Sequence, residues 1–201
     1  MKKATDRRKV LAVLAGGVVL GVGAAVTLAA WNDSEFATGT FTAGQFNLEG
    51  SIDGTDYDEH DSAGDAAEIV FTAGFDALAP GQVVYAPFWV RLDASTTVDA
   101  TLTPAGVTTD DGDNDEHLSY AVYPLAAGAT CGAAAVDGVD DLVSGATLDA
   151  STPGDADVQL AFGAAGTPGT AVQLCFEVTA GADLVEDTAA TATWQFTATS
   201  N

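Results

Sequence analysis

Apolar and polar residues alternate along much of the chain after residue 31, which is the pattern of strands buried on one face. Segments 170–179 and 189–199 show it most cleanly, with a stripe of threonines opposite the apolar stripe in the second. Segment 83–92 is the strongest strand, and Pro87 within it lacks a backbone donor, which predicts an edge position or a bulge. Further strands are expected at 67–71, 96–103, 118–125 and 157–162.

These segments are short and are separated by turns rich in Gly, Pro and Asp. In the turn 78–81, Pro80 fixes φ and Gly81 can take a positive φ. About eight or nine such strands predict an all-β fold, a β-sandwich or jelly roll. One short helix is expected at 133–143, and residues 31–201 are expected to form a single domain.

The chain begins with a different pattern. Five basic residues within the first nine precede Val10–Ala30, a run of 21 residues without a charge that ends in small residues. This layout predicts a secretory signal peptide at 1–30, cut between Ala30 and Trp31. Two alternatives stay open: the run is long enough to anchor the chain in a bilayer of roughly 30 Å, and the pair Arg7-Arg8 partly fits a twin-arginine export signal.

Charge then narrows the range of partners. The whole chain carries a formal charge of −23, and a cut after Ala30 leaves 171 residues with 28 acidic residues and one basic residue, Arg91. Such a surface repels nucleic acids and anionic membranes. We therefore expect no nucleic-acid partner, and membrane contact only through an uncleaved leader.

Two cysteines remain after such a cut, Cys131 and Cys175. An even pair in an exported chain favours one disulfide, which in the chain-entropy model contributes about 4 kcal/mol for a loop of this length. The alternatives are two buried thiols or a metal site, although neither cysteine has the C-x-x-C spacing of zinc ligands.

One acidic stretch has the spacing of a calcium loop. Asp111, Asp113 and Asp115 match its first three ligands, but Glu116 and Val122 occupy the positions where an EF-hand needs Gly and Glu. The EF-hand reading therefore fails. A looser calcium site and a solvated acidic hairpin tip both stay open.

Motifs for catalysis are missing. His60 and His117 each lie in an acidic run, and neither belongs to an H-E-x-x-H zinc motif. The sequence contains no G-x-S-x-G nucleophile elbow and no phosphate-binding loop. We expect no enzymatic activity and no cofactor other than calcium. Tyr85 and Trp89 lie on the polar face of segment 83–92, and these exposed aromatic residues are the basis of an alternative hypothesis, a carbohydrate-binding surface.

Several short motifs carry a family resemblance. They are Ala29-Ala30 before Trp31-Asn32-Asp33, then Thr40-Phe41-Thr42-Ala43-Gly44 and Phe46-Asn47-Leu48, the turn Leu78-Ala79-Pro80-Gly81, and the closing Trp194-Gln195-Phe196. Together they resemble the SipW-dependent exported proteins of Gram-positive bacteria, which include the TasA and camelysin relatives and the actinobacterial alternate signal-mediated exported proteins. The resemblance implies a cut between Ala30 and Trp31 by an ER-type, SipW-like signal peptidase.

The same resemblance implies a jelly-roll-like sandwich that is secreted and acts at the cell surface or in the biofilm matrix. TasA relatives form fibres, in which the freed N-terminal segment of one subunit is thought to complete a sheet of the next. The matching assembly segment here would include Trp31, Asp33, Phe41, Gly44, Phe46 and Leu48. The cysteine pair and the loss of lysines depart from the family. Camelysins have been called metalloproteases, but no zinc motif supports that activity here.

We therefore expect a non-enzymatic, self-associating structural protein. The alternative is a calcium- or carbohydrate-binding surface module.

Overall fold

The computed structural model describes residues 2–26, 34–110, 112–126 and 128–201, and every structural statement below concerns these residues. The chain divides into two compact units, Met1–Thr42 and Ala43–Asn201. The first unit contains the helix α1 (Lys2–Val26). Within the described residues, no helix combines the length and the apolar character needed to cross a membrane.

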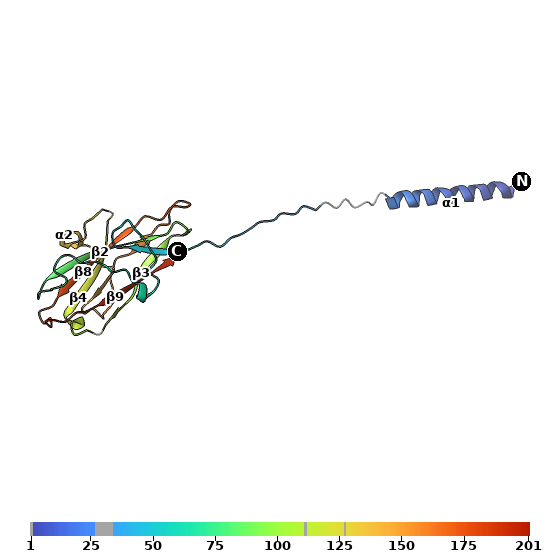
Figure 1. Ribbon diagram of the computed structural model, residues 1–201. Coiled ribbons are helices and arrows are strands. Elements are labelled where there is room, and N and C mark those ends of the chain that lie inside the picture. Colours follow the sequence, from blue (N-terminus) through green and yellow to red (C-terminus); the bar gives the residue numbers. More distant parts are fainter. Residues whose placement is uncertain (1, 27–33, 111, 127) are drawn as a thin grey trace. The chain divides into compact units, whose positions relative to one another are not determined.

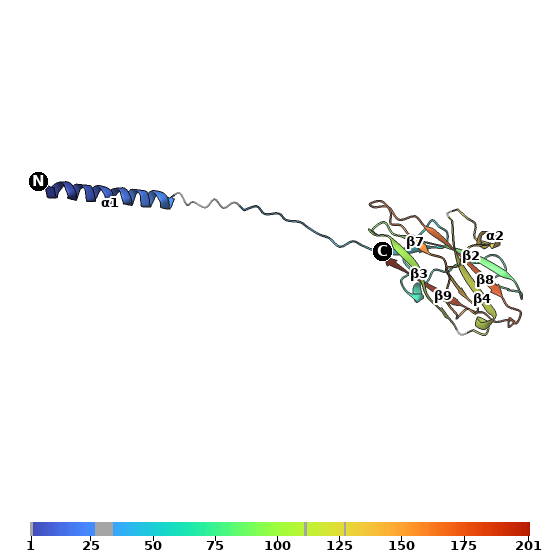
Figure 2. The same cartoon turned by 180° about the vertical axis from the view of Figure 1, so that it is seen from behind.

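The second unit is a sandwich of two antiparallel sheets (Figure 1). In spatial order, the larger sheet contains β1 (Leu48–Ser51), β2 (Val83–Leu92), β8 (Val172–Ala180), β4 (Leu118–Leu125), β5 (Val143–Gly145) and β6 (Thr152–Pro153). The smaller sheet contains β7 (Val158–Leu160), β3 (Ala100–Thr109) and β9 (Ala192–Ser200), labelled in Figure 2. Short 3-10 turns lie at Ala63–Asp65 and Asp115–His117. The predicted all-β sandwich is confirmed.

Aromatic side chains join the two sheets. Phe176 of β8 is 2% exposed and meets Trp194 and Phe196 of β9 edge to face, with ring centroids 5.0 and 6.0 Å apart. Around them lie buried aliphatic residues from both sheets, including Leu92, Leu102, Leu160 and Leu174. The alternate residues that the sequence placed on the apolar faces of β2, β8 and β9 are the ones that build this core.

Pro87 lies at an unpaired edge, as predicted. It stands opposite Cys175 of β8, while β1 covers only Trp89–Leu92 on the other side of β2. The backbone N and O of Tyr85 bond to Thr72, away from β8. Because alternate residues of a strand direct their backbone groups to the same side, the missing donor of Pro87 also falls on the side away from β8.

Three expected elements were wrong in position or kind. Segment 67–71 forms no strand. The strand expected at 96–103 begins only at Ala100, and Val98, before it, is 39% exposed. The helix expected at 133–143 is a single turn, α2 (Ala133–Val136), after which Val143 begins β5.

A second, smaller core covers the outer face of the larger sheet. The predicted disulfide between Cys131 and Cys175 is present and ties the segment that carries α2 to the middle of β8. Leu125, Val136 and Cys175 are buried there, with Tyr85 and Tyr123 packed beside them. The segment between β4 and β5 is thereby held against the sheet.

Candidate functional site

The chain enters the sandwich at Gln45 and Asn47, which bind to the loop after β2. Thr97 N donates to the Gln45 carbonyl over 3.1 Å, and Asn47 N donates to Thr96 Oγ1 over 2.8 Å. The Asn47 carbonyl accepts from Asp93 N at 3.1 Å. We call Gln45, Asn47, Asp93, Thr96 and Thr97 the anchor, because they fix the point at which the sandwich begins.

Asp93 holds the far half of the anchor in place. Its Oδ1 accepts hydrogen bonds from the backbone N of Ser95 at 3.1 Å and of Thr96 at 2.9 Å, and from Thr96 Oγ1 at 2.8 Å. Burial of this carboxylate favours its neutral form, but the hydrogen bonds from Ser95 and Thr96 outweigh that effect and lower the pKa of Asp93 below its ordinary value. Asp93 is therefore ionised in the folded protein at neutral pH.

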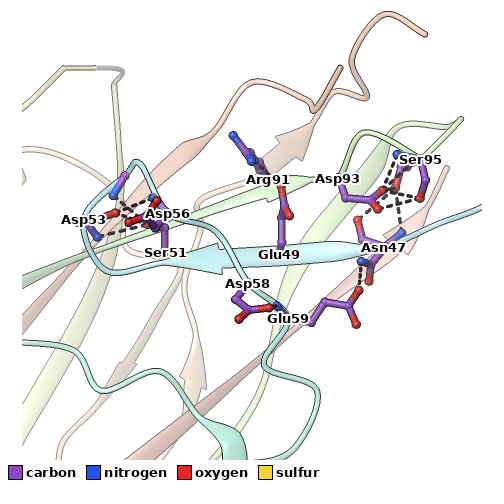
Figure 3. A network of polar contacts seen from close by, with 12 residues as sticks. Asn47, Glu49, Ser51, Asp53, Asp56, Asp58, Glu59, Arg91, Asp93 and Ser95 are labelled. Carbon is purple, nitrogen blue, oxygen red and sulfur yellow. Dashed lines mark hydrogen bonds and ion pairs between the residues drawn. The ribbon is translucent and has the colours of Figure 1, made fainter. Parts of the chain in front are cut away.

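An ion pair fastens β1 to β2 just beyond the anchor. Arg91 Nε lies 2.5 Å from Glu49 Oε1, and the two residues face each other across the ladder. The guanidinium of Arg91 also stacks on Tyr57, 3.6 Å from the ring centroid, in a cation–π contact. Figure 3 shows Asn47 and Asp93 at one end of β1, Glu49 and Arg91 along it, and Ser51 and Asp53 at the other end.

The acidic loop after β1 closes the outer edge of that strand. Gly50 exchanges two backbone hydrogen bonds with Asp58, at 2.9 and 3.0 Å. Asp53 Oδ1 accepts from the backbone N of Asp56 at 2.9 Å and of Thr55 at 2.8 Å, and these bonds lower the pKa of Asp53. Gly54 takes a φ of +75°, and a side chain there would meet the Trp89 ring at 3.1 Å, so this tight turn requires glycine.

The expected assembly segment is divided in the structure. Phe41 is 96% exposed and Phe36, five residues earlier, is 93% exposed, and both precede the sandwich in the chain. Gly44 lies beside the Thr97 side chain, Phe46 is 40% exposed, and Leu48 begins β1 and packs against the core. Trp31, Asp33 and the expected cut between Ala30 and Trp31 lie outside the described residues.

The three residues of the expected calcium loop are not seen together. Asp111 lies outside the described residues, Asp113 is exposed, and Asp115 is buried. Asp115 Oδ2 accepts from Gly112 N at 3.1 Å, while its buried Oδ1 has no partner among the described residues. Among the described residues, no three His, Cys, Asp or Glu side chains lie close enough together to hold a metal ion. Calcium binding here stays a prediction.

This loop has a clear structural task. The side chain of Asn114, 5% exposed, donates to Thr188 Oγ1 at 2.7 Å and accepts from Val185 N at 2.8 Å. It thereby ties the loop before β4 to the loop before β9.

Of the two histidines, His60 Nδ1 lies 3.0 Å from the Asp65 carbonyl, and the backbone carbonyl of His117 accepts from Gly181 N at 2.7 Å.

A shallow depression lies on the outer face of the larger sheet, beside α2. Tyr85, Tyr123 and Glu177 line it together with Val136 and Val139. Burial and the neighbouring Glu177 carboxylate raise the pKa of Tyr85 to about 12, so its hydroxyl stays protonated and able to donate at neutral pH. Burial also raises the pKa of Tyr123.

The sequence did not predict the anchor, and of the residues that line the depression it singled out only Tyr85. The anchor joins Asn47 to Thr96 across 49 positions, and the local signal that could have revealed half of it is the motif Asp93-Ala94-Ser95-Thr96, typical of a turn capped by a side chain. The depression brings together β2, β4, β8 and the segment with α2, and no local sequence pattern predicts that they meet.

No protein-family model and no curated protein matches this sequence.

Proposed function

We propose that this protein is exported and acts as a non-enzymatic structural protein of the cell surface or extracellular matrix, where copies associate through the segment that precedes the anchor. The Cys131–Cys175 disulfide is compatible with an extracellular site, because such bonds persist in oxidising compartments. The resemblance of the N-terminal motifs to SipW-dependent exported proteins also supports this proposal.

The observation that carries the proposal is the contrast on the two sides of the anchor. Residues from Gln45 onward are bonded to the sandwich, whereas Phe36 and Phe41, a few residues earlier, are 93% and 96% exposed. Residues 34–44 contain no charge except Glu35. Two exposed aromatic rings in a segment with a single charge favour burial against another molecule, because such rings gain free energy when they leave water.

A pelleting assay tests this proposal. Residues 31–201 are compared with residues 43–201 and with the variant Phe36→Ser/Phe41→Ser in 31–201. The shorter chain keeps the anchor, β1 and every residue of the described core, so it retains what the sandwich needs to fold. We expect 31–201 to sediment in a concentration-dependent manner and both altered forms to stay in the supernatant.

Val98→Ser in 31–201 is the matched control, because Val98 is an exposed apolar residue within the sandwich, at 39% exposure. It should sediment like the unaltered chain. If 31–201 stays monomeric at high concentration, or if all forms sediment alike, the assembly proposal fails.

One observation favours the alternative of a ligand-binding surface module. In the depression beside α2, two tyrosine rings flank a carboxylate, which is an arrangement that can stack on a sugar ring and bind its hydroxyls. Trp89, which was expected to belong to the carbohydrate-binding surface, lies instead against the turn at Gly54. Titration calorimetry with matrix polysaccharides checks this alternative: heat that is lost in Tyr123→Ala but kept in Trp89→Phe would favour it.

A further inference from the structure

Four strands form the edges of the two sheets, and three of them are protected against pairing with another chain. β1 has four residues and is covered by Asp58, β6 has two residues and contains Pro153, and β7 has three residues. The fourth, β9, has nine residues with no proline and no charged residue. The bulge of its ladder lies on the partner strand, between Pro104 and Gly106. Short length, proline, charge and bulges are the usual protections of an edge, and β9 has none of them.

The open edge of β9 can be assigned residue by residue. Asp110 N donates to the Thr191 carbonyl, and Asn201 N donates to the Asp99 carbonyl, so odd-numbered residues at both ends of β9 face β3. Backbone groups alternate sides along an antiparallel strand. Those of Ala192, Trp194, Phe196, Ala198 and Ser200 therefore face away from β3. Among the described residues they have no hydrogen-bond partner on that side.

Charge indicates which kind of partner fits this edge. The chain has 29 acidic and 6 basic residues, so two copies repel each other over most of their surfaces. The outward side chains of β9 are Thr193, Gln195, Thr197 and Thr199, and across the ladder they meet Thr101, Thr103 and Thr108 of β3. Along β9 itself, two acidic molecules can therefore approach without bringing like charges together; the acids Asp99 and Asp110 lie at its two ends.

We propose that β9 pairs with β9 of a second copy, in antiparallel orientation about a two-fold axis at Phe196, to join two three-stranded sheets into one sheet of six. Even-numbered residues then exchange the hydrogen bonds: Phe196 with Phe196 of the second copy, Trp194 with Ala198, and Ala192 with Ser200. This register pairs all nine residues of each strand, whereas a shift in either direction leaves residues unpaired. A closed two-fold interface of this kind limits the assembly at this edge to a dimer.

The register makes a specific prediction for the outward residues. Gln195 lies opposite Thr197 of the second copy in a pair without mutual hydrogen bonds, where Cα atoms are about 4.5 Å apart. That distance suits a disulfide, whereas Thr197 and its own copy are diagonal neighbours, about 7–8 Å apart, which is too far. Both native cysteines are already bonded to each other, so introduced thiols can be tested alone.

The test uses residues 43–201, so that the segment before the anchor cannot contribute. Gln195→Cys and Thr197→Cys chains are mixed and oxidised, and each is also oxidised alone. We expect a covalent dimer in the mixture at several times the yield of either chain alone. Thr103→Cys, on the same exposed face but one strand further from the edge, is the matched control and should give little dimer with any partner.

A second variant tests the β9–β9 pairing without an introduced thiol. Ala198→Pro deletes one backbone donor on the open edge and none of the bonds to β3, so the melting temperature in dilute solution should change little while the dimer is lost. This inference rests on the proposed self-association, but it does not use the segment before the anchor, so the two can fail separately.

A monomer of 43–201 at high concentration, or equal cross-linking of all three cysteine chains, would overturn the β9 pairing. Association that needs residues 31–42 and gives no Gln195–Thr197 cross-link would overturn it as well, because the N-terminal segment of another copy would then be the partner. Self-association of 31–201 would in that case still stand.

Discussion

At the scale of single residues, one carboxylate defines where the sandwich begins. Asp93 binds the backbone of Ser95 and Thr96, and the Thr96 hydroxyl in turn binds the backbone of Asn47. The pKa of Asp93 is lowered, so its contribution to stability is fully present above its ordinary pKa of 3.8 and is lost as the pH falls through its folded-state value.

We predict that Asp93→Asn lowers the free energy of unfolding at pH 7 by about 1 kcal/mol, or about 3 °C in Tm for a domain of this size. The gap between variant and unaltered protein should hold from pH 7 to about pH 4 and then narrow, because the native carboxylate becomes protonated. Thermal melts across pH check this. Asp76→Asn, at an exposed acid without a side-chain hydrogen bond among the described residues, is the control and should show no such gap.

Single residues also show what a sequence can reveal. Pro87 and Gly81 were predicted correctly, because their constraints are properties of the residues themselves; Gly81 has a φ of +79°. The partly buried ion pair of Arg91 and Glu49 was not predicted, because its two residues lie on different strands, 42 positions apart in the chain. The sequence showed only that Arg91 is the single basic residue after residue 9.

At the scale of elements, alternation identified β2, β4, β8 and β9 to within three residues, since one-sided burial leaves a period of two in the sequence. Segment 67–71 alternates too, but it pairs with no strand of either sheet, and a strand requires a paired neighbour as well as a pattern. Strands as short as β5 and β6 have too few residues to show a period.

The Cys131–Cys175 disulfide is the main covalent constraint at this scale. We predict that its reduction lowers the free energy of unfolding by about 4 kcal/mol in the chain-entropy model. The segment with α2 should detach before the sandwich unfolds, because its own small core includes Cys175. Denaturant titrations with and without reductant measure the effect. A Cys131→Ala/Cys175→Ala chain is the control, and it should not respond to reductant.

At the scale of the whole molecule, the surplus of acidic residues opposes any association of copies. The proposed contacts, in the segment with Phe36 and Phe41 and along β9, contain almost no charge. Salt screens the repulsion between the bodies and leaves such contacts intact.

We therefore predict that association of residues 31–201 becomes tighter as NaCl rises from 0.05 to about 0.5 M, a range over which the Debye length falls severalfold. Sedimentation equilibrium measures the trend. Weaker association at high salt would mean that ion pairs hold the copies together, contrary to both proposed contacts.

The most direct measurement is hydrogen–deuterium exchange of residues 31–201 at a low and a high protein concentration. One experiment follows the peptide with Phe36 and Phe41, the peptide of β9, and a core peptide from β8 as the internal reference. We predict fast exchange of the first at low concentration, marked protection of the first two at high concentration, and no change in β8. Equal exchange at both concentrations in all three peptides would contradict assembly through these surfaces.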